Sequence, residues 1–295
     1  MIDALALAPT TMLLSQHFKQ ADGLATFSNM NALLSLIEHE NQPLLHFWLL
    51  DNTVIMGLRD ADVPHLSAAH KVLTDHGYSG FIRNSGGLAV VADAGVLNIS
   101  LFFPPSLVKL GVDDAYEQMK LLVDRAFPEL PIDAGEVARS YCPGTYDLSV
   151  NGHKIAGMSQ RRRNGGTVIM LYLSVNGNQN ARAQLIHDFY TVGLGHEENK
   201  WDFPDVDPGT MMNVGDLLPQ SLTIEAARQR FIDAAQQSGT HLAKQHLATL
   251  MQEPEFGAHL DFEAKRLSQH QPSFWIYRQY HEKIGQWPSH ISRRI

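Results

Sequence analysis

Apolar residues recur along this chain with two periods, one typical of helices and one typical of strands. Helical spacing is clear over 22–38, where apolar residues return every three or four positions. The same spacing predicts an amphipathic helix over 112–127, which prolines end. Further helices are expected at 64–76, 181–192, 210–218, 221–237, 240–251 and 255–269. Helical patterns therefore dominate the second half of the chain.

Short runs rich in aromatic and branched residues predict strands that turn residues separate. Asn151-Gly152 is typical of a type I′ hairpin, because both central residues of that turn take positive φ angles. We expect Asn164-Gly165-Gly166 to close a second hairpin, and Asp51-Asn52 to close a third. The predicted strands are 44–50, 53–57, 81–83, 88–92, 96–103, 147–150, 153–160 and 167–175.

Groups of strands followed by helices indicate an α+β architecture rather than a doubly wound one. We therefore predict mixed or antiparallel sheets flanked by helices. A length of 295 residues allows one large catalytic domain with an extension. We place the domain at 1–237, with its core at about 40–237, and a helical C-terminal extension at 238–295.

Charge and cysteine content narrow the possible functions. A formal net charge of -8 disfavours nucleic acid and anionic membranes as partners. The single cysteine, Cys142, excludes an internal disulfide and suits a reducing compartment. Residues 1–14 lack the features of a signal peptide, and no run approaches the ~20 apolar residues of a membrane span. We expect a cytoplasmic protein that acts on a small molecule or on another protein.

A glycine-rich loop, 83–89, separates two of the predicted strands. Its glycines allow either a tight turn alone or the close approach of a ligand to backbone N–H groups. It matches neither a phosphate-binding loop nor a dinucleotide fingerprint, because no Gly-Lys-Ser/Thr and no helix follow it.

Cys142 and Lys154 are the candidate catalytic residues. Most lone cysteines are inert packing residues, but Pro143-Gly144 holds this one on a loop, where reactive groups are often presented. Strand alternation puts Lys154 on the face of Ala156, which predicts an inward ammonium. Such an ammonium can stabilise a thiolate or an acyl oxyanion.

Arg161, Arg162 and Arg163 form the densest cationic cluster of the sequence. Short charge runs are commonly solvated strand ends, but on an acidic protein this cluster can also capture an acidic partner. His196-Glu197-Glu198 has neither the spacing nor the helical context of a zinc site, so we predict no metal site.

Three motifs, in order, resemble the biotin/lipoate protein ligase superfamily. They span roughly 45–190, and their similarity is greatest to the octanoyl-[glycine cleavage H protein]:protein N-octanoyltransferases of Gram-positive bacteria. The motifs are Arg83-Asn84-Ser85-Gly86-Gly87-Leu88-Ala89-Val90-Val91, Gly95-Val96-Leu97-Asn98-Ile99-Ser100-Leu101, and Tyr141-Cys142-Pro143-Gly144-Thr145-Tyr146-Asp147-Leu148-Ser149 with residues 154–162.

The resemblance implies the superfamily's α+β catalytic fold and roles for particular residues. Cys142 is expected to form an acyl-thioester, and Lys154 is expected to face the acyl carbonyl. The substrate and acyl-binding positions implied in this way are Arg83, Ser85, Gly86, Gly87, Leu88, Ala89, Asn98, Gly144, Asp147 and Gly157.

The implied reaction moves an octanoyl group from the lipoyl-lysine of octanoylated glycine cleavage H protein to lipoyl domains of 2-oxoacid dehydrogenase acyltransferase subunits. Exchanging one lysine amide for another keeps the bond type, so neither ATP nor a metal cofactor is expected. The acyl group itself is the covalent intermediate. Acidic acceptor domains would dock on Arg161, Arg162 and Arg163, and the acid for the leaving amine is water, Lys154 or Asp147.

Three alternatives stay open on the sequence. An octanoyltransferase that takes its acyl group from acyl carrier protein shares the cysteine chemistry. An ATP-dependent lipoate ligase needs no cysteine and commonly has a third glycine where Leu88 stands. A ligase-like domain that only binds lipoyl domains would be unaffected by Cys142→Ser.

Overall fold

Two β-sheets form the framework of the protein, which a computed structural model describes over residues 5–7, 9–105, 110–163 and 166–273. The larger sheet has eight strands: β1 (Thr10–Phe18), β2 (Leu44–Leu50), β6 (Val96–Phe103), β7 (Asp133–Ala134), β8 (Leu148–Val150), β9 (His153–Arg163), β10 (Gly166–Ser174) and β11 (His241–Lys244). The smaller sheet consists of β3 (Thr53–Met56), β4 (Ser79–Ile82) and β5 (Val90–Ala92). The strand order is β11-β1-β2-β6-β10-β9-β8-β7 in the large sheet and β4-β3-β5 in the small sheet. Both sheets contain parallel and antiparallel strand pairs.

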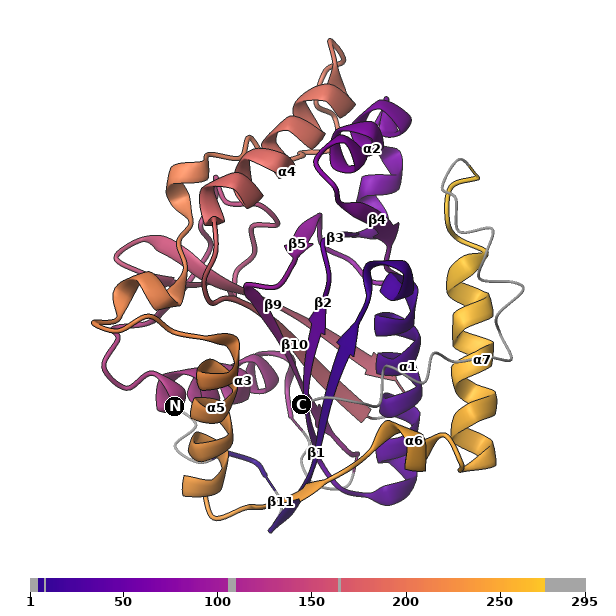
Figure 1. Cartoon of the computed structure of the whole chain (residues 1–295), viewed down its shortest axis with the longest axis vertical. Helices are drawn as coiled ribbons and strands as arrows, with labels where there is room; N and C mark the ends of the chain where they lie inside the picture. Colours follow the sequence, from indigo (N-terminus) through magenta and orange to yellow (C-terminus); the bar gives the residue numbers. More distant parts are fainter. Residues whose placement is uncertain (1–4, 8, 106–109, 164–165, 274–295) are drawn as a thin grey trace.

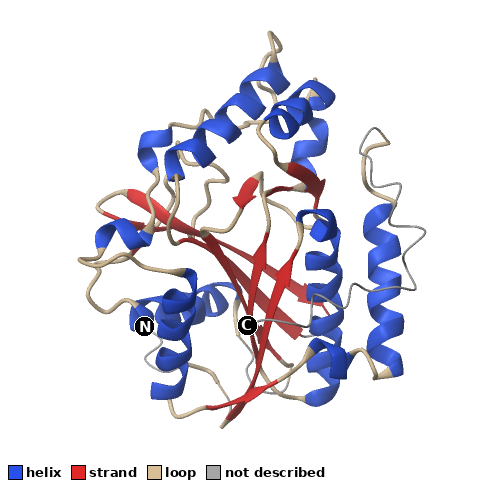
Figure 2. Ribbon diagram, viewed as in Figure 1, coloured by secondary structure: helices blue, strands red, loops and turns tan. Residues whose placement is uncertain are grey.

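Helices cover both faces of the large sheet (Figures 1 and 2). They are α1 (Gly23–Glu40), α2 (Leu66–Asp75), α3 (Val112–Ala126), α4 (Gln179–Leu194), α5 (Ile224–Gln237), α6 (Leu247–Leu250) and α7 (Pro254–Ser268), with short 3-10 helices at Gln20–Asp22, Leu58–Asp62, Pro208–Thr210 and Val214–Leu217. α1 lies on one face with α7 packed along it, and α3 and α5 cover the other face. α2 and α4 pack against each other beside the small sheet.

β6 runs through the centre of the large sheet and is buried on both faces. Leu97, Ile99 and Leu101 pack in the core beneath α3 and α5, as the two-residue period of a strand requires. The alternate positions Asn98 and Ser100 are buried and polar, and they face α1. The α1 side of the sheet is therefore the face where polar chemistry can be buried.

The helix predicted at 240–251 is confirmed only over α6 (Leu247–Leu250) and is wrong before it. Its first part forms β11, which pairs in parallel with β1, from Thr10↔His241 to Leu13↔Lys244. β1 itself had no predicted counterpart. A strand as short as β11 leaves little periodic signal, because its stability comes from hydrogen bonds to β1 rather than from its own composition. Likewise, 210–218 contains the 3-10 helix Val214–Leu217 and only the last residue of the 3-10 helix Pro208–Thr210, in place of the predicted helix.

The hairpin predicted across Asp51-Asn52 is also wrong, because its two strands belong to different sheets. The turn passes the chain from β2 in the large sheet to β3 in the small one. β4 and β5 both pair with β3, so the glycine loop between them crosses over β3 rather than closing a hairpin. The Asn151-Gly152 turn is confirmed, with φ angles of 51° and 79°. Asn164-Gly165 lies outside the described residues.

The C-terminal part packs against the rest of the chain. β11 extends the large sheet at β1, and α7 contacts α1 (Figure 1). The division of the chain at residue 237 stays a prediction. Among the described residues, no helix combines the length and apolar character needed to cross a membrane.

Candidate active site

The loop between β4 and β5 is folded around the side chain of Arg83. Its buried guanidinium donates hydrogen bonds of 2.8 to 3.1 Å to backbone carbonyls of this loop and of β3. Gly87 takes a φ of +87°, and a Cβ there would lie 2.5 Å from Arg83 Nη2 and 3.4 Å from Cys142 Sγ. The conformation and the close approach both require glycine at this position.

Cys142 lies on the loop between β7 and β8 and is half-buried. Its φ of 47° is left-handed, which is uncommon for a residue with a Cβ and is often found at functional sites. The Leu88 backbone N–H points at the sulfur, with an N···Sγ distance of 3.2 Å. This N–H group can stabilise negative charge on the sulfur or on an oxygen bonded next to it.

Lys154 is fully buried beneath the cysteine loop. Its Nζ donates to the carbonyls of Tyr141 at 3.0 Å and Cys142 at 2.8 Å. It also lies 3.2 Å from Ser140 Oγ and 2.9 Å from Asp147 Oδ1. The three N–H bonds of the ammonium therefore face four acceptors, and they tie β9 to the backbone that carries the thiol.

A β-bulge turns Lys154 toward this loop. Ile155 and Ala156 both pack in the core beneath α3 and α5, because the β8–β9 register shifts between Leu148 and Ser149. Lys154 therefore shares a face with Gly157 rather than with Ala156. A Cβ at Gly157 would lie 3.3 Å from Lys154 Cε. The inward orientation is confirmed, while the predicted neighbour on its face is wrong.

Asp147 is the buried counterion of Lys154. Its second oxygen accepts the backbone N–H groups of Gly144 at 3.1 Å and Val137 at 3.3 Å. Burial raises the pKa of Asp147, and the Lys154 ammonium and the N–H groups oppose that rise. One carboxylate thus fixes both the lysine and the loop after Cys142.

A narrow cavity of about 60 Å³ opens beside Cys142 and reaches α1. Apolar side chains form most of its wall, which suits an acyl chain. Two of them, Met158 and Met170, are flexible and can make room for a longer ligand. The lining residues are Phe27, Trp48, Ile55, Arg83, Val90, Asn98, Cys142, Gly157, Met158, Ser159, Met170, Leu171 and Tyr172.

Four of these lining residues, Trp48, Asn98, Tyr172 and Gly157, form one row across neighbouring strands. Asn98 Nδ2 is buried and has no acceptor in the described part of the chain. Burial raises the pKa of Tyr172 well above its ordinary value, so the phenol stays neutral. A Cβ at Gly157 would lie 2.6 Å from the Tyr172 ring. Glycine there lets the ring lie against β9 and shape the cavity.

A hydrogen-bonded chain holds the far end of the glycine loop. Tyr190 Oη accepts the Ala89 N–H at 3.1 Å and donates to Asp60 Oδ1 at 2.8 Å. The other Asp60 oxygen accepts the Gly57 N–H at 2.8 Å. Burial raises the pKa of Asp60 to about 6, although these hydrogen bonds favour its charged form. This chain positions Ala89, next to the Leu88 N–H that points at the thiol.

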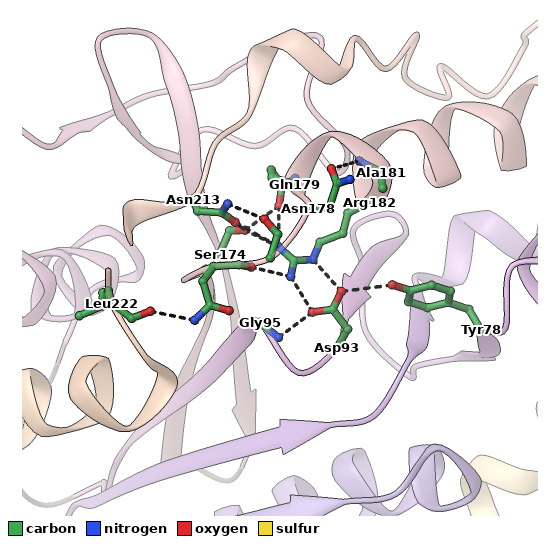
Figure 3. Close-up of polar contacts among 12 residues, drawn as sticks. Tyr78, Asp93, Gly95, Ser174, Asn178, Gln179, Ala181, Arg182, Asn213 and Leu222 are labelled. Atoms are coloured by element: carbon green, nitrogen blue, oxygen red, sulfur yellow. Dashed lines mark hydrogen bonds and ion pairs between the residues drawn. The ribbon is translucent and has the colours of Figure 1, made fainter. Parts of the chain in front are cut away.

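A buried polar network centred on Arg182, which Figure 3 shows, reaches the residue before Cys142 through Gln179. The Arg182 guanidinium makes two hydrogen bonds of 2.7 Å to the Asp93 carboxylate. It also donates to Ser174 Oγ at 3.1 Å and Gln179 Oε1 at 3.3 Å. Gln179 Nε2 lies 3.5 Å from the hydroxyl of Tyr141, the residue before Cys142. Burial raises the pKa of Tyr141 to about 12.

The three consecutive arginines do not form one patch. Arg161 donates to Asn84 Oδ1 at 2.7 Å, at the edge of the glycine loop. Arg162 points to the opposite side of β9, where it donates to a backbone carbonyl before α3 at 2.6 Å. Arg163 forms an ion pair of 2.8 Å with the buried Glu263 of α7. Docking by these residues stays a prediction, and Arg161 is the one beside the site.

The structure brings most predicted site residues together. Arg83, Asn98, Cys142 and Gly157 line the cavity, the loop 85–89 contacts Cys142 through the Leu88 N–H, and Lys154 and Asp147 lie beneath the cysteine loop. Their catalytic roles stay predictions. Asp60, Tyr172 and Tyr190 were missed. Pairing β10 with β9 in the predicted hairpin could have placed Tyr172 beside Gly157, but no motif marks the other two.

Comparisons with known proteins give the family of the chain. Residues 22–236 match the lipoyl protein ligase A/B catalytic domain. The chain belongs to this family. The octanoyl-[GcvH]:protein N-octanoyltransferase of Exiguobacterium sibiricum is 46% identical over 72% of this chain and 78% of its own. Its namesake from Macrococcus caseolyticus is 37% identical over 80% and 86%. The lipoyl-[GcvH]:protein N-lipoyltransferase of Listeria monocytogenes is 35% identical over 72% and 78%.

Solved structures confirm the predicted fold. A lipoate-protein ligase A bound with ATP aligns over 88% of this chain and 95% of its own, with a TM-score of 0.63 and 16% identity. A bi-partite lipoate protein ligase from Thermoplasma acidophilum aligns over 95% and 98%, with a TM-score of 0.62 and 18% identity. At these identities the likeness concerns the fold alone. The described residues contain no group of three or more metal-ligating side chains placed to hold an ion.

Proposed function

We propose that the chain is a protein N-octanoyltransferase that takes octanoyl from the lipoyl-lysine of glycine cleavage H protein. Its acceptors are the lipoyl domains of 2-oxoacid dehydrogenase acyltransferase subunits. The observation that carries the proposal is the Leu88 N–H, 3.2 Å from the single thiol, beside a mostly apolar cavity. The names of the relatives give the donor and the acyl group.

The first step forms a thioester on Cys142. The sulfur attacks the octanoyl amide carbonyl, and the C–N bond breaks as the lysine amine of the donor leaves. The proton that the thiol gives up balances the proton that the leaving amine takes, so the step needs no net acid. The Leu88 N–H stabilises the tetrahedral oxyanion, while the Lys154 ammonium holds the Cys142 loop in place and supplies positive charge beneath it.

The second step reverses the first with another amine. The lysine of the acceptor attacks the thioester carbonyl, an amide forms, and the Cys142 sulfur leaves. Because one lysine amide replaces another, the exchange is close to thermoneutral and requires neither ATP nor a metal. The mechanism also needs Cys142 as a free thiol, which fits action in the reducing cytoplasm.

A second candidate acyl group is lipoyl. The relative from Listeria monocytogenes carries the name of a lipoyltransferase. The cavity also holds an unpaired donor, Asn98 Nδ2, so its wall is not uniformly apolar. Both acyl groups would use the same thioester on Cys142.

The test offers the protein three donors in the absence of ATP: octanoylated H protein, lipoylated H protein and octanoyl-acyl carrier protein. Intact-mass measurement is expected to show an octanoyl adduct on Cys142 from octanoylated H protein, and its loss when an apo lipoyl domain is added. If the adduct forms only from octanoyl-acyl carrier protein, acyl carrier protein would be the donor in place of H protein. A requirement for ATP would favour the ligase reaction instead.

A further inference from the structure

A second hollow, of about 280 Å³, lies between the glycine loop and α7. Ile82, Arg83 and Asn84 form one wall, and Arg266 and His270 form the other. Arg83 also lines the cavity beside Cys142, so the two spaces share a wall. The hollow therefore lies next to the cavity that Cys142 lines.

Gln271, which follows α7, is fixed against the last residue of β4, next to the glycine loop. Its side-chain amide accepts the Ile82 N–H at 2.9 Å and donates to the Ile82 carbonyl at 2.9 Å. These are the backbone groups immediately before Arg83, at the edge of the small sheet. α7 also packs along α1 (Figure 1). Hydrogen bonds and helix packing thus hold the walls of the hollow in place, and α7 forms the wall that faces the site.

The hollow has an excess of positive charge. The buried carboxylate of Glu263 pairs with both Arg163 at 2.8 Å and Arg266 at 2.7 Å, so one carboxylate serves two guanidinium groups. Arg161 lines the hollow, and the described residues place no carboxylate within ion-pair distance of it. Burial lowers the pKa of Arg161, repulsion from Arg266 and Arg163 adds to this effect, and attraction to Glu263 opposes it.

Asn84 adds an unsatisfied donor to this wall. Arg161 Nη1 donates to Asn84 Oδ1 at 2.7 Å, which fixes the orientation of the amide and turns Nδ2 away. Asn84 Nδ2 is buried and has no acceptor in the described part of the chain. Arg161 and Arg266 both line the hollow, and two guanidinium groups are a donor set that fits a carboxylate.

We propose that this hollow binds an acidic side chain, close to the modified lysine, of the protein that carries the acyl group. The proposal rests on the proposed function and adds the contribution of α7, which lies beyond the matched residues 22–236. A carboxylate held there anchors the partner, and the acylated lysine then extends past Arg83 toward Cys142. Recognition of the protein partner is thereby separated from recognition of the acyl chain.

The test compares a protein donor with an uncharged small donor. Arg161→Gln and Arg266→Gln are expected to raise the KM for octanoylated H protein about tenfold each, with kcat unchanged. Added salt should raise the KM for octanoylated H protein more in the unmodified protein than in the double variant Arg161→Gln/Arg266→Gln. Acylation of Cys142 by the octanoyl thioester of N-acetylcysteamine should stay as it was in every variant.

Two controls separate charge from packing. Arg266→Lys keeps the charge beside Glu263 and should retain most of the affinity. Arg230→Gln removes an arginine that pairs with Glu129 on the opposite side of the sheet, and it should change neither parameter.

Unchanged KM values for H protein in Arg161→Gln and Arg266→Gln would overturn the docking site. An equal loss with the small thioester would do the same. Saturable binding of AMP that depends on Arg266, with no effect on the KM for H protein, would assign the hollow to a phosphate ligand instead. Failure of the small thioester to label Cys142 in the unmodified protein would refute the proposed chemistry and not the docking site.

Discussion

The Lys154→Met variant separates two roles of the buried ammonium, which holds the cysteine loop and supplies positive charge beneath it. Methionine is of similar length but has neither charge nor donors. The substitution removes the hydrogen bonds to the Tyr141 and Cys142 carbonyls. It also leaves the carboxylate of Asp147, whose side chain is 2% exposed, without its ion-pair partner.

The size of the effect follows from that unpaired carboxylate. Removing one partner of a buried ion pair costs about 3–5 kcal/mol. Domains unfold with free energies of about 5–15 kcal/mol, so the variant is expected to fold but to be much less stable. Adding Asp147→Asn removes the unpaired charge while keeping an oxygen for the Gly144 N–H. We expect the double variant to recover about 2 kcal/mol.

Urea unfolding and single-turnover octanoyl transfer measure the two roles independently. Both the single and the double variant should lose about 10²–10³-fold in the rate of thioester formation, since neither has the ammonium. Stability should recover only in the double variant. If transfer returned together with stability, the role of Lys154 would be purely structural and our reasoning would be refuted.

Three further changes have defined outcomes. Tyr190→Phe removes the hydroxyl between the glycine loop and Asp60, which should slow octanoyl transfer and lower the unfolding free energy by about 1–3 kcal/mol. Arg182→Met leaves Asp93 unpaired, so it should lower the unfolding free energy in urea titrations by about 3–5 kcal/mol. Lys71→Met breaks an exposed ion pair and should lower the same free energy by less than about 1 kcal/mol. Because burial raises the Asp60 pKa from 3.8 to about 6, the folded state retains a proton that the unfolded chain releases. The unfolding free energy should therefore fall, relative to Asp60→Asn, by about 3 kcal/mol from pH 4 to pH 6 and stay level above.

Local signals were enough to predict the hairpin at the centre of the site. The Asn151-Gly152 turn fixed the pairing of its strands, and that turn placed Lys154 near the loop of Cys142. The bulge at Ile155 could not be predicted from the sequence, because the position of an extra residue in a strand depends on the side chains that pack on the two faces of the sheet. The orientation of Lys154 was therefore right although its predicted neighbours were wrong.

Contacts between distant segments could not be read from the sequence. Tyr190 and Asp60 are 130 positions apart, and neither lies in a recognisable motif. β11 becomes a strand because β1 offers it a free edge, and Arg161 to Arg163 diverge because alternate residues of a strand point to opposite faces. In each case the tertiary partner, rather than the local composition, decides the outcome.

Rapid-quench mass analysis of the octanoyl thioester on Cys142 tests the central claim most directly. With octanoylated H protein, the adduct should form at least as fast as the overall turnover. It should then decay at the turnover rate when apo acceptor domain is added, and Cys142→Ser should form no adduct and transfer no acyl group. A thioester that appears more slowly than product, or turnover that persists in Cys142→Ser, would contradict the mechanism.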